Sequence, residues 1–327
     1  MRSLSIFTLG LLSLFIAGRN KQMGIHTYSP EIFEKGCIST QDNEFGATFS
    51  PDGKTCFFTK TTASTIQSST IIICVSYLKN GKWLKPAIAP FSGRYKDFNP
   101  MFSPDGEKLF FISNRTSNDK KTFDCDIWVV NKLDEGWSEP ENIGAPINSH
   151  GWELGCSVAN NGTIYFSSTG TTGNADIYYS RFVDGKYQKP DTLSDAINSP
   201  YSETDPFISP DEGYLLFTSQ YRLDALIGPG ADSNYPRQDI YISYKKEGKW
   251  QPAQNIGNPV NSDAAETNPF ISADGKTLFY TSERNFVSIP MKKKLIYSEF
   301  ENKIHDTQNG LGDIYQISSR CLEKFKK

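Results

Sequence analysis

The sequence has very little excess charge of either sign: 34 Lys and Arg residues face 37 Asp and Glu residues, a formal net charge of −3. A protein dedicated to nucleic acid needs a basic surface that displaces the counterions of the phosphates, so we predict no nucleic-acid partner. Only 37% of the residues are hydrophobic, whereas 13% are aromatic. This combination favours β-strands joined by polar turns.

Residue sets that carry common catalytic and metal chemistry are also missing. The histidines, His26, His150 and His305, are isolated in the sequence, and no Gly-x-Ser-x-Gly segment offers a serine nucleophile. The six cysteines form no CxxC pair, which argues against a zinc site. We therefore predict no catalytic residue, no bound metal and no cofactor.

Long hydrophobic runs are confined to residues 4–17, which follow Arg2. The run is too short to span a bilayer and is typical of a secretory signal peptide, which we assign to residues 1–18; an uncleaved signal anchor is the alternative. Residues 16–18 are similar to a lipobox, but Arg19 stands where a lipoprotein has its acylated Cys. We predict a secreted or periplasmic protein of the bacterial envelope, with no lipid anchor and no transmembrane span in the mature chain.

In an oxidising compartment two of the cysteines could form a disulfide. Cys56 and Cys74 fall in neighbouring predicted strands. They form a disulfide under oxidising conditions, or they remain buried free thiols.

Beyond residue 28 the sequence is a repeat. A turn motif, Ser-Pro-Asp-Gly in its fullest form, occurs five times, in residues 49–54, 102–107, 159–162, 208–212 and 271–276. Each copy precedes an apolar or aromatic run, and four copies continue to an Asp-Ile-aromatic element, at Asp126, Asp176, Asp239 and Asp313. Because Pro and Asp favour a tight turn and the runs favour strands, each repeat predicts a four-stranded antiparallel unit, the size of a propeller blade.

The first and last repeats are incomplete in complementary ways. Residues 30–39 resemble the fourth strand of a repeat without the first three, and the fifth copy has no such strand after Asp313. We predict that the N-terminal strand completes the fifth blade and removes two sheet edges. The predicted fold class is all-β, a single five-bladed β-propeller; a sixth degenerate blade within residues 283–312 is the alternative.

The predicted propeller covers residues 25–327, with blades at about 44–93, 94–149, 150–199, 200–262 and 263–320 plus 30–39. Its core, Ser-Pro-Asp-Gly-Lys-x-Leu-Phe-Phe-x-Ser followed by Asp-Ile-Tyr, resembles the WD40-like repeat of TolB-type β-propellers over nearly the whole mature chain. The resemblance implies an exported scaffold for protein contacts. TolB itself has an additional N-terminal α/β domain that has no counterpart here, so its place in an envelope complex is not implied.

A carboxylate recurs eight positions before each turn Asp or Asn: Glu44, Asp97, Glu153, Glu203 and Glu266. Each stands where the chain enters a predicted innermost strand, so the five should ring the mouth of the channel, on the face that receives the long loops. Two interpretations are open. The acids are structural and pair with backbone N–H groups or with Arg115, Arg222 and Arg284, or they bind a cation, an amine or a basic peptide.

Polar and aromatic residues accompany these acids. Three asparagines precede three of the acids by five residues, and two aromatic residues lie close by in the sequence: Asn148, Asn198, Asn261, Trp152 and Tyr201. We predict that these ten residues contribute to a ligand-binding site at the channel mouth.

Together these features predict an exported, monomeric, non-enzymatic scaffold that binds a protein or a cell-envelope carbohydrate through its long-loop face. The alternative is a glycosidase or lyase that uses the channel-mouth carboxylates. Geometry separates the two hypotheses: carboxylates about 5 to 10 Å apart in a deep pocket favour the enzyme, whereas five acids each bonded to its own blade disfavour it.

Overall fold

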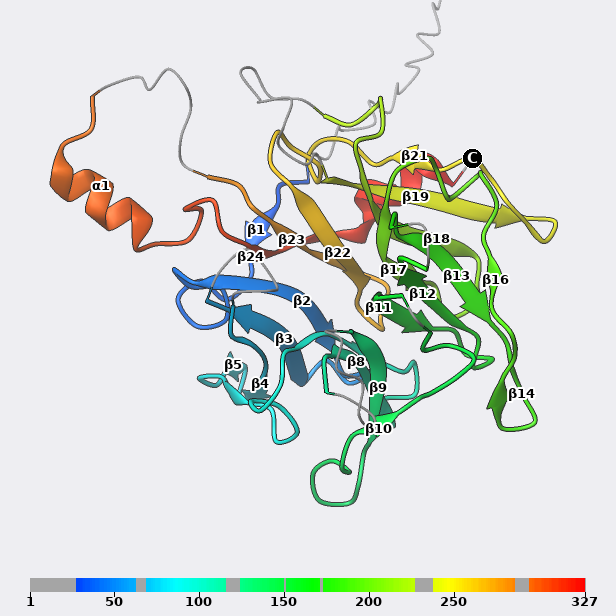
Figure 1. Ribbon diagram of the computed structural model, residues 1–327. Coiled ribbons are helices and arrows are strands. Elements are labelled where there is room, and N and C mark those ends of the chain that lie inside the picture. The colour runs from blue at the N-terminus through cyan, green and yellow to red at the C-terminus, as the bar shows by residue number, and fades with distance from the viewer. Residues whose placement is uncertain are drawn as a thin grey trace, which may run out of the picture.

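The computed structural model describes residues 28–62, 69–115, 124–149, 151–170, 173–226, 238–285 and 294–326. These residues form five antiparallel sheets of four or five strands, arranged as the blades of a β-propeller, and one separate two-stranded hairpin (Figure 1). The predicted fold class is confirmed. The predicted signal segment, residues 1–18, lies outside the described residues. Among the helices of the described part, none has the length and apolar character to cross a membrane.

Within each blade the strands follow one another outward from the channel. Blade 1 contains β2 (Asn43–Phe49), β3 (Thr55–Thr61), β4 (Ile71–Lys79) and β6 (Ala87–Ile88). Blade 2 contains β7 (Asp97–Phe102), β8 (Lys108–Ser113), β9 (Asp126–Asn131) and β10 (Glu141–Asn142). Blade 3 contains β11 (Glu153–Val158), β12 (Ile164–Ser168), β13 (Asp176–Ser180) and β16 (Asp191–Thr192). Blade 4 contains β17 (Glu203–Ile208), β18 (Tyr214–Gln220), β19 (Gln238–Lys246) and β21 (Gln254–Asn255).

Blade 5 is built from both ends of the described chain. It contains β22 (Glu266–Ile271), β23 (Thr277–Ser282), β24 (Asp313–Ser318) and β1 (Glu31–Ile32). β1 runs antiparallel to β24, with Glu31 opposite Gln316, and the Phe33 N–H donates to the Ile314 carbonyl at 2.8 Å. The predicted closure by the N-terminal strand is therefore confirmed.

Short elements complete the described chain. Two-residue strands form hairpins at the outer edge of blades 1, 3 and 4: β5 (Lys82–Trp83), β14 (Phe182–Val183), β15 (Lys186–Tyr187) and β20 (Lys249–Trp250). A 3-10 helix, Ser319–Phe325, follows β24. In the described part of residues 283–312 the structure has the helix α1 (Tyr297–Ile304), which lies apart from the sheets (Figure 1). The alternative of a sixth blade there is wrong.

The repeated turns fold as their chemistry predicts. In the first copy, one oxygen of Asp52 accepts hydrogen bonds from the Ser50 hydroxyl at 2.6 Å and the Lys54 N–H at 3.0 Å. Gly53 then takes the left-handed conformation (φ 68°), which glycine adopts without a steric penalty. The turn fixes the register of the first two strands in each blade.

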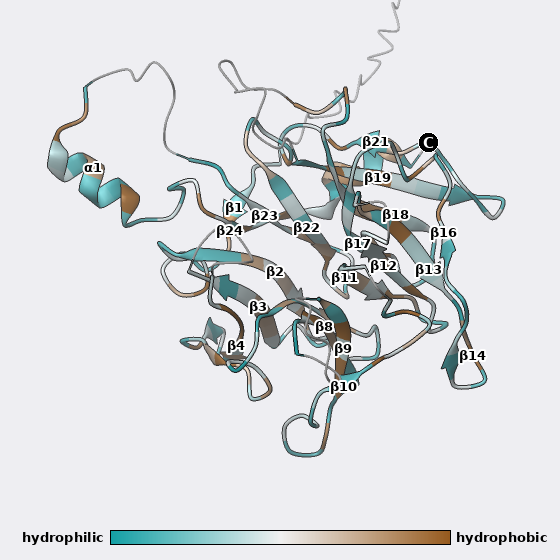
Figure 2. Ribbon diagram, in the orientation of Figure 1, coloured by the Kyte–Doolittle hydropathy of each residue, from teal (hydrophilic) through white to brown (hydrophobic). Residues whose placement is uncertain are grey.

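Apolar side chains fill the seams between blades. Figure 2 shows hydrophobic residues along strands such as β8 and β9 and hydrophilic ones in the hairpin that carries β14. The aromatic residue of each Gly-Lys-aromatic turn packs toward the preceding blade: the Trp83 ring lies 5.7 Å from that of Phe33, and the Trp137 ring 5.7 Å from that of Phe57. These contacts hold neighbouring blades together in a rigid ring.

The cysteines are free thiols in the structure. Cys56 lies opposite Ser76, and Cys74 lies opposite Phe58, so the two predicted partners do not face each other across β3 and β4. Of the two alternatives, the structure shows the buried free thiols.

Candidate functional site

The five predicted mouth acids stand at the start of the innermost strands, as expected. Their side chains are fully buried: Glu44, Asp97, Glu153, Glu203 and Glu266 each have 0% exposure. They belong to five different blades and point into the links between blades rather than into a shared cavity.

Glu203 shows the arrangement. Its two oxygens accept hydrogen bonds from the N–H of Ser199 at 2.9 Å and from the hydroxyl of Ser199 at 2.6 Å. A third bond comes from the Ser219 hydroxyl at 2.8 Å. The carboxylate therefore joins the inter-blade link to the end of the second strand of its own blade. Glu266 repeats these bonds with Ser262 and Ser282.

Four of the five acids have a cationic partner of their own. The ion-pair distances are 3.0 Å for Lys60–Glu44, 2.8 Å for Arg115–Asp97, 3.0 Å for Arg222–Glu203 and 3.5 Å for Arg284–Glu266. The predicted pairing with the three arginines is thus present. The negative charges of these four acids are therefore balanced by cations of the protein itself. A ligand-binding role for the acids stays a prediction.

Glu153 is the exception among the five. In the described residues no Lys or Arg pairs with it, and Gly170 stands two positions after Ser168, where blade 2 has Arg115 two positions after Ser113. One oxygen accepts bonds from Ser149 at 3.2 Å and Ser168 at 3.1 Å, and the other has no partner. Burial without a cation raises the pKa of Glu153 to about 8.

The predicted asparagines bind backbone. Asn148 accepts a hydrogen bond from the Ile127 N–H and donates one to the Ile127 carbonyl, both at 2.9 Å. Asn198 and Asn261 do the same for Ile177 and Ile240. Each side-chain amide thereby extends the sheet at the start of a third strand. Of the two aromatic residues, Trp152 is half-buried and Tyr201 is 36% exposed.

A second set of residues, which the sequence analysis missed, lines the channel. These residues lie two positions after the five acids: Gly46, Asn99, Gly155, Asp205 and Asn268. At each of these sites the pairing of the innermost strand shifts register, which marks a β-bulge. Four of the five have positive φ, between 48° and 61°. Only Gly, Asn and Asp adopt this conformation readily, which explains the residue types found there.

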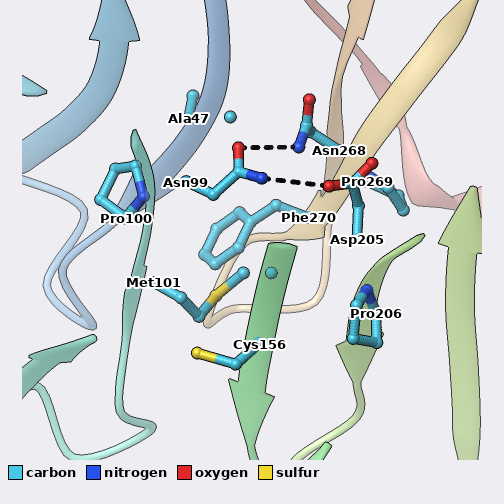
Figure 3. Close-up of a pocket in the computed structure, with 12 residues that line it drawn as sticks. Ala47, Asn99, Pro100, Met101, Cys156, Asp205, Pro206, Asn268, Pro269 and Phe270 are labelled. Carbon is cyan, nitrogen blue, oxygen red and sulfur yellow. Dashed lines mark hydrogen bonds between the residues drawn. The ribbon is translucent and has the colours of Figure 1, made fainter. Parts of the chain in front are cut away.

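The bulge residues form a network across the channel (Figure 3). Asn99 donates its side-chain amide to Asp205 at 3.2 Å and to the Leu154 carbonyl at 2.8 Å. Its carbonyl oxygen accepts a bond from the Asn268 amide at 3.1 Å. A Cβ at Gly46 would lie 2.8 Å from that same oxygen, so glycine leaves room for Asn99. The network joins blades 2, 3, 4 and 5 at the axis of the ring.

Asp205 is the one carboxylate among the residues that line this cavity. Thr204 donates to its second oxygen at 3.1 Å, and the side chain is half-buried. Burial raises the pKa of Asp205 to about 6, against hydrogen bonds that lower it. The cavity beside it measures about 20 Å³, enough for about one water molecule. The arrangement can exchange a proton with a bound water near neutral pH.

The sequence contains a pattern that marks the five bulge residues. Each acid is followed two positions later by Gly, Asn or Asp, and in three blades proline comes next, at Pro100, Pro206 and Pro269. In the described ranges no group of three or more His, Cys, Asp or Glu side chains is arranged to hold a metal ion.

The fold and this network define a five-bladed β-propeller with a polar centre. No protein-family model and no curated protein matches the chain. A solved arabinanase from Bacillus subtilis is similar to it, with 10% identity and a TM-score of 0.50, over 86% of this chain and 95% of that one. The catalytic domain of a GH62 α-L-arabinofuranosidase from Coprinopsis cinerea has 10% identity and a TM-score of 0.48, over 89% and 96%. A protein described as TolB from Agrobacterium tumefaciens has 17% identity and a TM-score of 0.46, over 78% and 77%.

These similarities correct the predicted function. The prediction of a non-enzymatic scaffold is wrong, because the chain is similar to an arabinanase, and the alternative of a glycosidase or lyase agrees better. The TolB-type resemblance holds for the propeller fold, whereas membership of the WD40-like repeat family stays a prediction. At such low identity the likeness concerns the fold, and the chemistry is argued from the residues of this chain.

Proposed function

We propose that this chain is a glycosidase and that Asp205 is its proton-exchanging group. The observation that carries the proposal is the position of Asp205: it is the one carboxylate that lines the channel cavity, and burial raises its pKa to about 6. A general base works best when its pKa lies near the working pH. The predicted mouth acids are less suited, because their side chains are fully buried and line no part of this cavity.

The surroundings of Asp205 suit a base that activates water. Asn99 and Thr204 donate hydrogen bonds to Asp205. Hydrogen bonds from Thr218 and from the Asn268 N–H also lower its pKa. To act as a base, Asp205 would exchange one of these bonds for a bond from a water in the adjacent cavity. The oxygen of that water would then bond to the anomeric carbon while the leaving group departs as its anion, and the proton from the water would remain on Asp205.

A lyase is the second candidate, and one observation favours it. The described lining of the cavity contains a single carboxylate beside two side-chain amides, Asn99 and Asn268. Hydrolysis of an ordinary glycoside uses a pair of carboxyl groups, whereas elimination from a uronic acid needs one base that removes the proton next to the sugar carboxylate. The products differ, because a lyase leaves a carbon–carbon double bond in the sugar.

The test uses para-nitrophenyl glycosides, whose leaving group needs no proton donor. The full chain should release nitrophenolate, and Asp205→Asn should lose most of this activity, by a factor of about 100 or more. Asp184→Asn is a matched control, because Asp184 is exposed and has the same φ of 51° as Asp205. A lyase would instead produce ultraviolet-absorbing unsaturated products from polyuronates. Equal activity of the Asp205→Asn variant and the wild type would refute the role of Asp205.

The predicted signal segment indicates where the protein would meet its substrate. We propose that the protein is exported and acts as a monomer on carbohydrate of the cell envelope or its surroundings. Fractionation of cells that express the full chain, followed by sedimentation of the purified protein, tests both parts of this proposal.

A further inference from the structure

A second cavity lies in the seam between blades 3 and 4, and it shares no lining residue with the channel cavity. It is a groove of about 820 Å³. Its walls come from β12 and β13 of blade 3 and from the β19–β20 hairpin of blade 4. The groove opens at the end of the blades that carries the first-to-second strand turns, so it is separate from the network around Asp205.

A strained residue forms part of this groove. Glu212 has a left-handed conformation (φ 56°) at the turn position where the other four repeats have glycine. Its carboxylate accepts hydrogen bonds from the Tyr165 hydroxyl at 2.6 Å and the Asn161 side chain at 3.0 Å, both in blade 3. A non-glycine residue in this conformation is unfavourable, and such strain is concentrated at functional positions.

Aromatic rings and cations line the same groove. The rings of Tyr165 and Tyr179 stack with centroids 5.8 Å apart, and Trp250 meets Tyr165 edge-on at 6.3 Å. The Arg181 guanidinium lies 5.8 Å from the Tyr179 ring centre, and the Lys245 ammonium lies 5.2 Å from that of Trp250. Two of the rings in the groove thus each have a cation within cation–π distance.

The charges of the groove favour an anion. Three cations line it, Arg181, Lys245 and Lys249, against two acids, Glu212 and Asp195. The Glu212 carboxylate is already engaged by its two hydrogen bonds within the seam. An acidic group that enters the groove would therefore meet three cations and two acids, a net charge of +1 in its favour.

We propose that this groove binds an acidic oligosaccharide, with a uronate carboxylate held by Arg181 and Lys245 and sugar rings placed against Tyr179 and Trp250. Aromatic side chains offer flat apolar faces beside polar groups, which suits the C–H faces and hydroxyls of a sugar. A peptide is disfavoured, because the edge strand of blade 3, β16, has two residues and gives a short template for strand addition. The site goes beyond the proposed function, since it holds a glycan without cleaving it.

The proposal is tested by calorimetric titration of the full chain with trigalacturonic acid and with the neutral galactotriose of the same linkage. The acidic trisaccharide should bind about tenfold more tightly than the neutral one, as expected for one charge-assisted contact. Arg181→Gln should weaken binding of the acid by a similar factor. Arg94→Gln is the matched control, because Arg94 is also exposed and lies 5.8 Å from its own tyrosine ring.

The outcomes separate this proposal from the proposed function. Asp205→Asn should leave the affinity for trigalacturonic acid unchanged, whether or not it abolishes turnover. Equal affinity for the neutral sugar, equal affinity of Arg181→Gln and wild type, or tighter binding of triglutamate than of trigalacturonic acid would each overturn the groove proposal.

Discussion

Asn99 donates its side-chain amide to Asp205 at 3.2 Å, although 106 positions separate the two residues in the sequence. One belongs to the innermost strand of blade 2 and the other to that of blade 4, so their bond crosses the channel. Because Asn99 also accepts from Asn268, the charge of Asp205 is stabilised by a chain of polarised amides.

Asn99→Asp should convert this contact into a pair of carboxylates. Aspartate tolerates the positive φ of this position, so the main effect is repulsion between two acids. At pH 8 the free energy of unfolding of the variant should be lower than that of the wild type by about 2 kcal/mol or more. At pH 5 this difference should be smaller, because the carboxylates are partly protonated. Urea unfolding at both values measures this. Asn80→Asp, at an exposed turn with φ 53°, should show no such difference.

The activity proposed for Asp205 should depend on pH with a defined sign. A general base is active when it is ionised, so nitrophenolate release should rise through an apparent pKa of about 6. The Asn99→Asp variant should move this rise to higher pH, because a second carboxylate makes ionisation of Asp205 less favourable. A pH profile with its rise below pH 5 in both proteins would contradict the assignment.

Glu153 should make the protein less stable as pH rises. Its pKa is raised from an ordinary value of 4.5 to about 8, so between these values the folded state holds a proton that the unfolded state has released. Stability is therefore full below pH 4.5 and is lost as pH rises through 8. We expect the free energy of unfolding of the wild type to fall between pH 5 and pH 8.5. In the Glu153→Gln variant this fall should be smaller by roughly 2 to 4 kcal/mol, as measured by urea unfolding at the two pH values. Glu135→Gln, at an exposed turn, should behave as wild type.

The N-terminal closure depends on Phe33. Its ring is buried and lies 5.3 Å from Phe49 and 5.2 Å from Phe279, in blades 1 and 5. Phe33→Ala should lower the free energy of unfolding by about 3 to 5 kcal/mol, because it leaves a cavity at the seam that closes the ring. Phe300→Ala, on the helix that lies apart from the sheets, should change it by less than about 0.5 kcal/mol. Similar effects of the two changes would show that the seam is not held by Phe33.

The sequence predicted the blades well because each repeat carries local signals. Turn residues such as Asp52 and Gly53 act within a few positions, and the complementary gaps at residues 30–39 and after Asp313 required closure by the N-terminal strand. The mouth acids were also placed correctly at the starts of the innermost strands.

The direction of the side chains was harder to foresee. In a regular strand, residues two positions apart face the same side, so Glu203 and Asp205 would both face the channel. The bulge and the positive φ at Asp205 break this alternation, and Glu203 turns into the seam while Asp205 lines the cavity. The contact of Asp205 with Asn99 depends on blades packed around a ring, which no local pattern encodes.

The pairing of Glu31 with Gln316 also has a consequence for synthesis. A ribosome makes β1 first, yet its partner β24 emerges only after four blades have been completed. During that interval the ring is an open arc, with the innermost edges and the seam residues of the last blade uncovered. We therefore expect closure to be the final step of folding, and nascent chains that stall before residue 313 to be the ones that chaperones and proteases recognise.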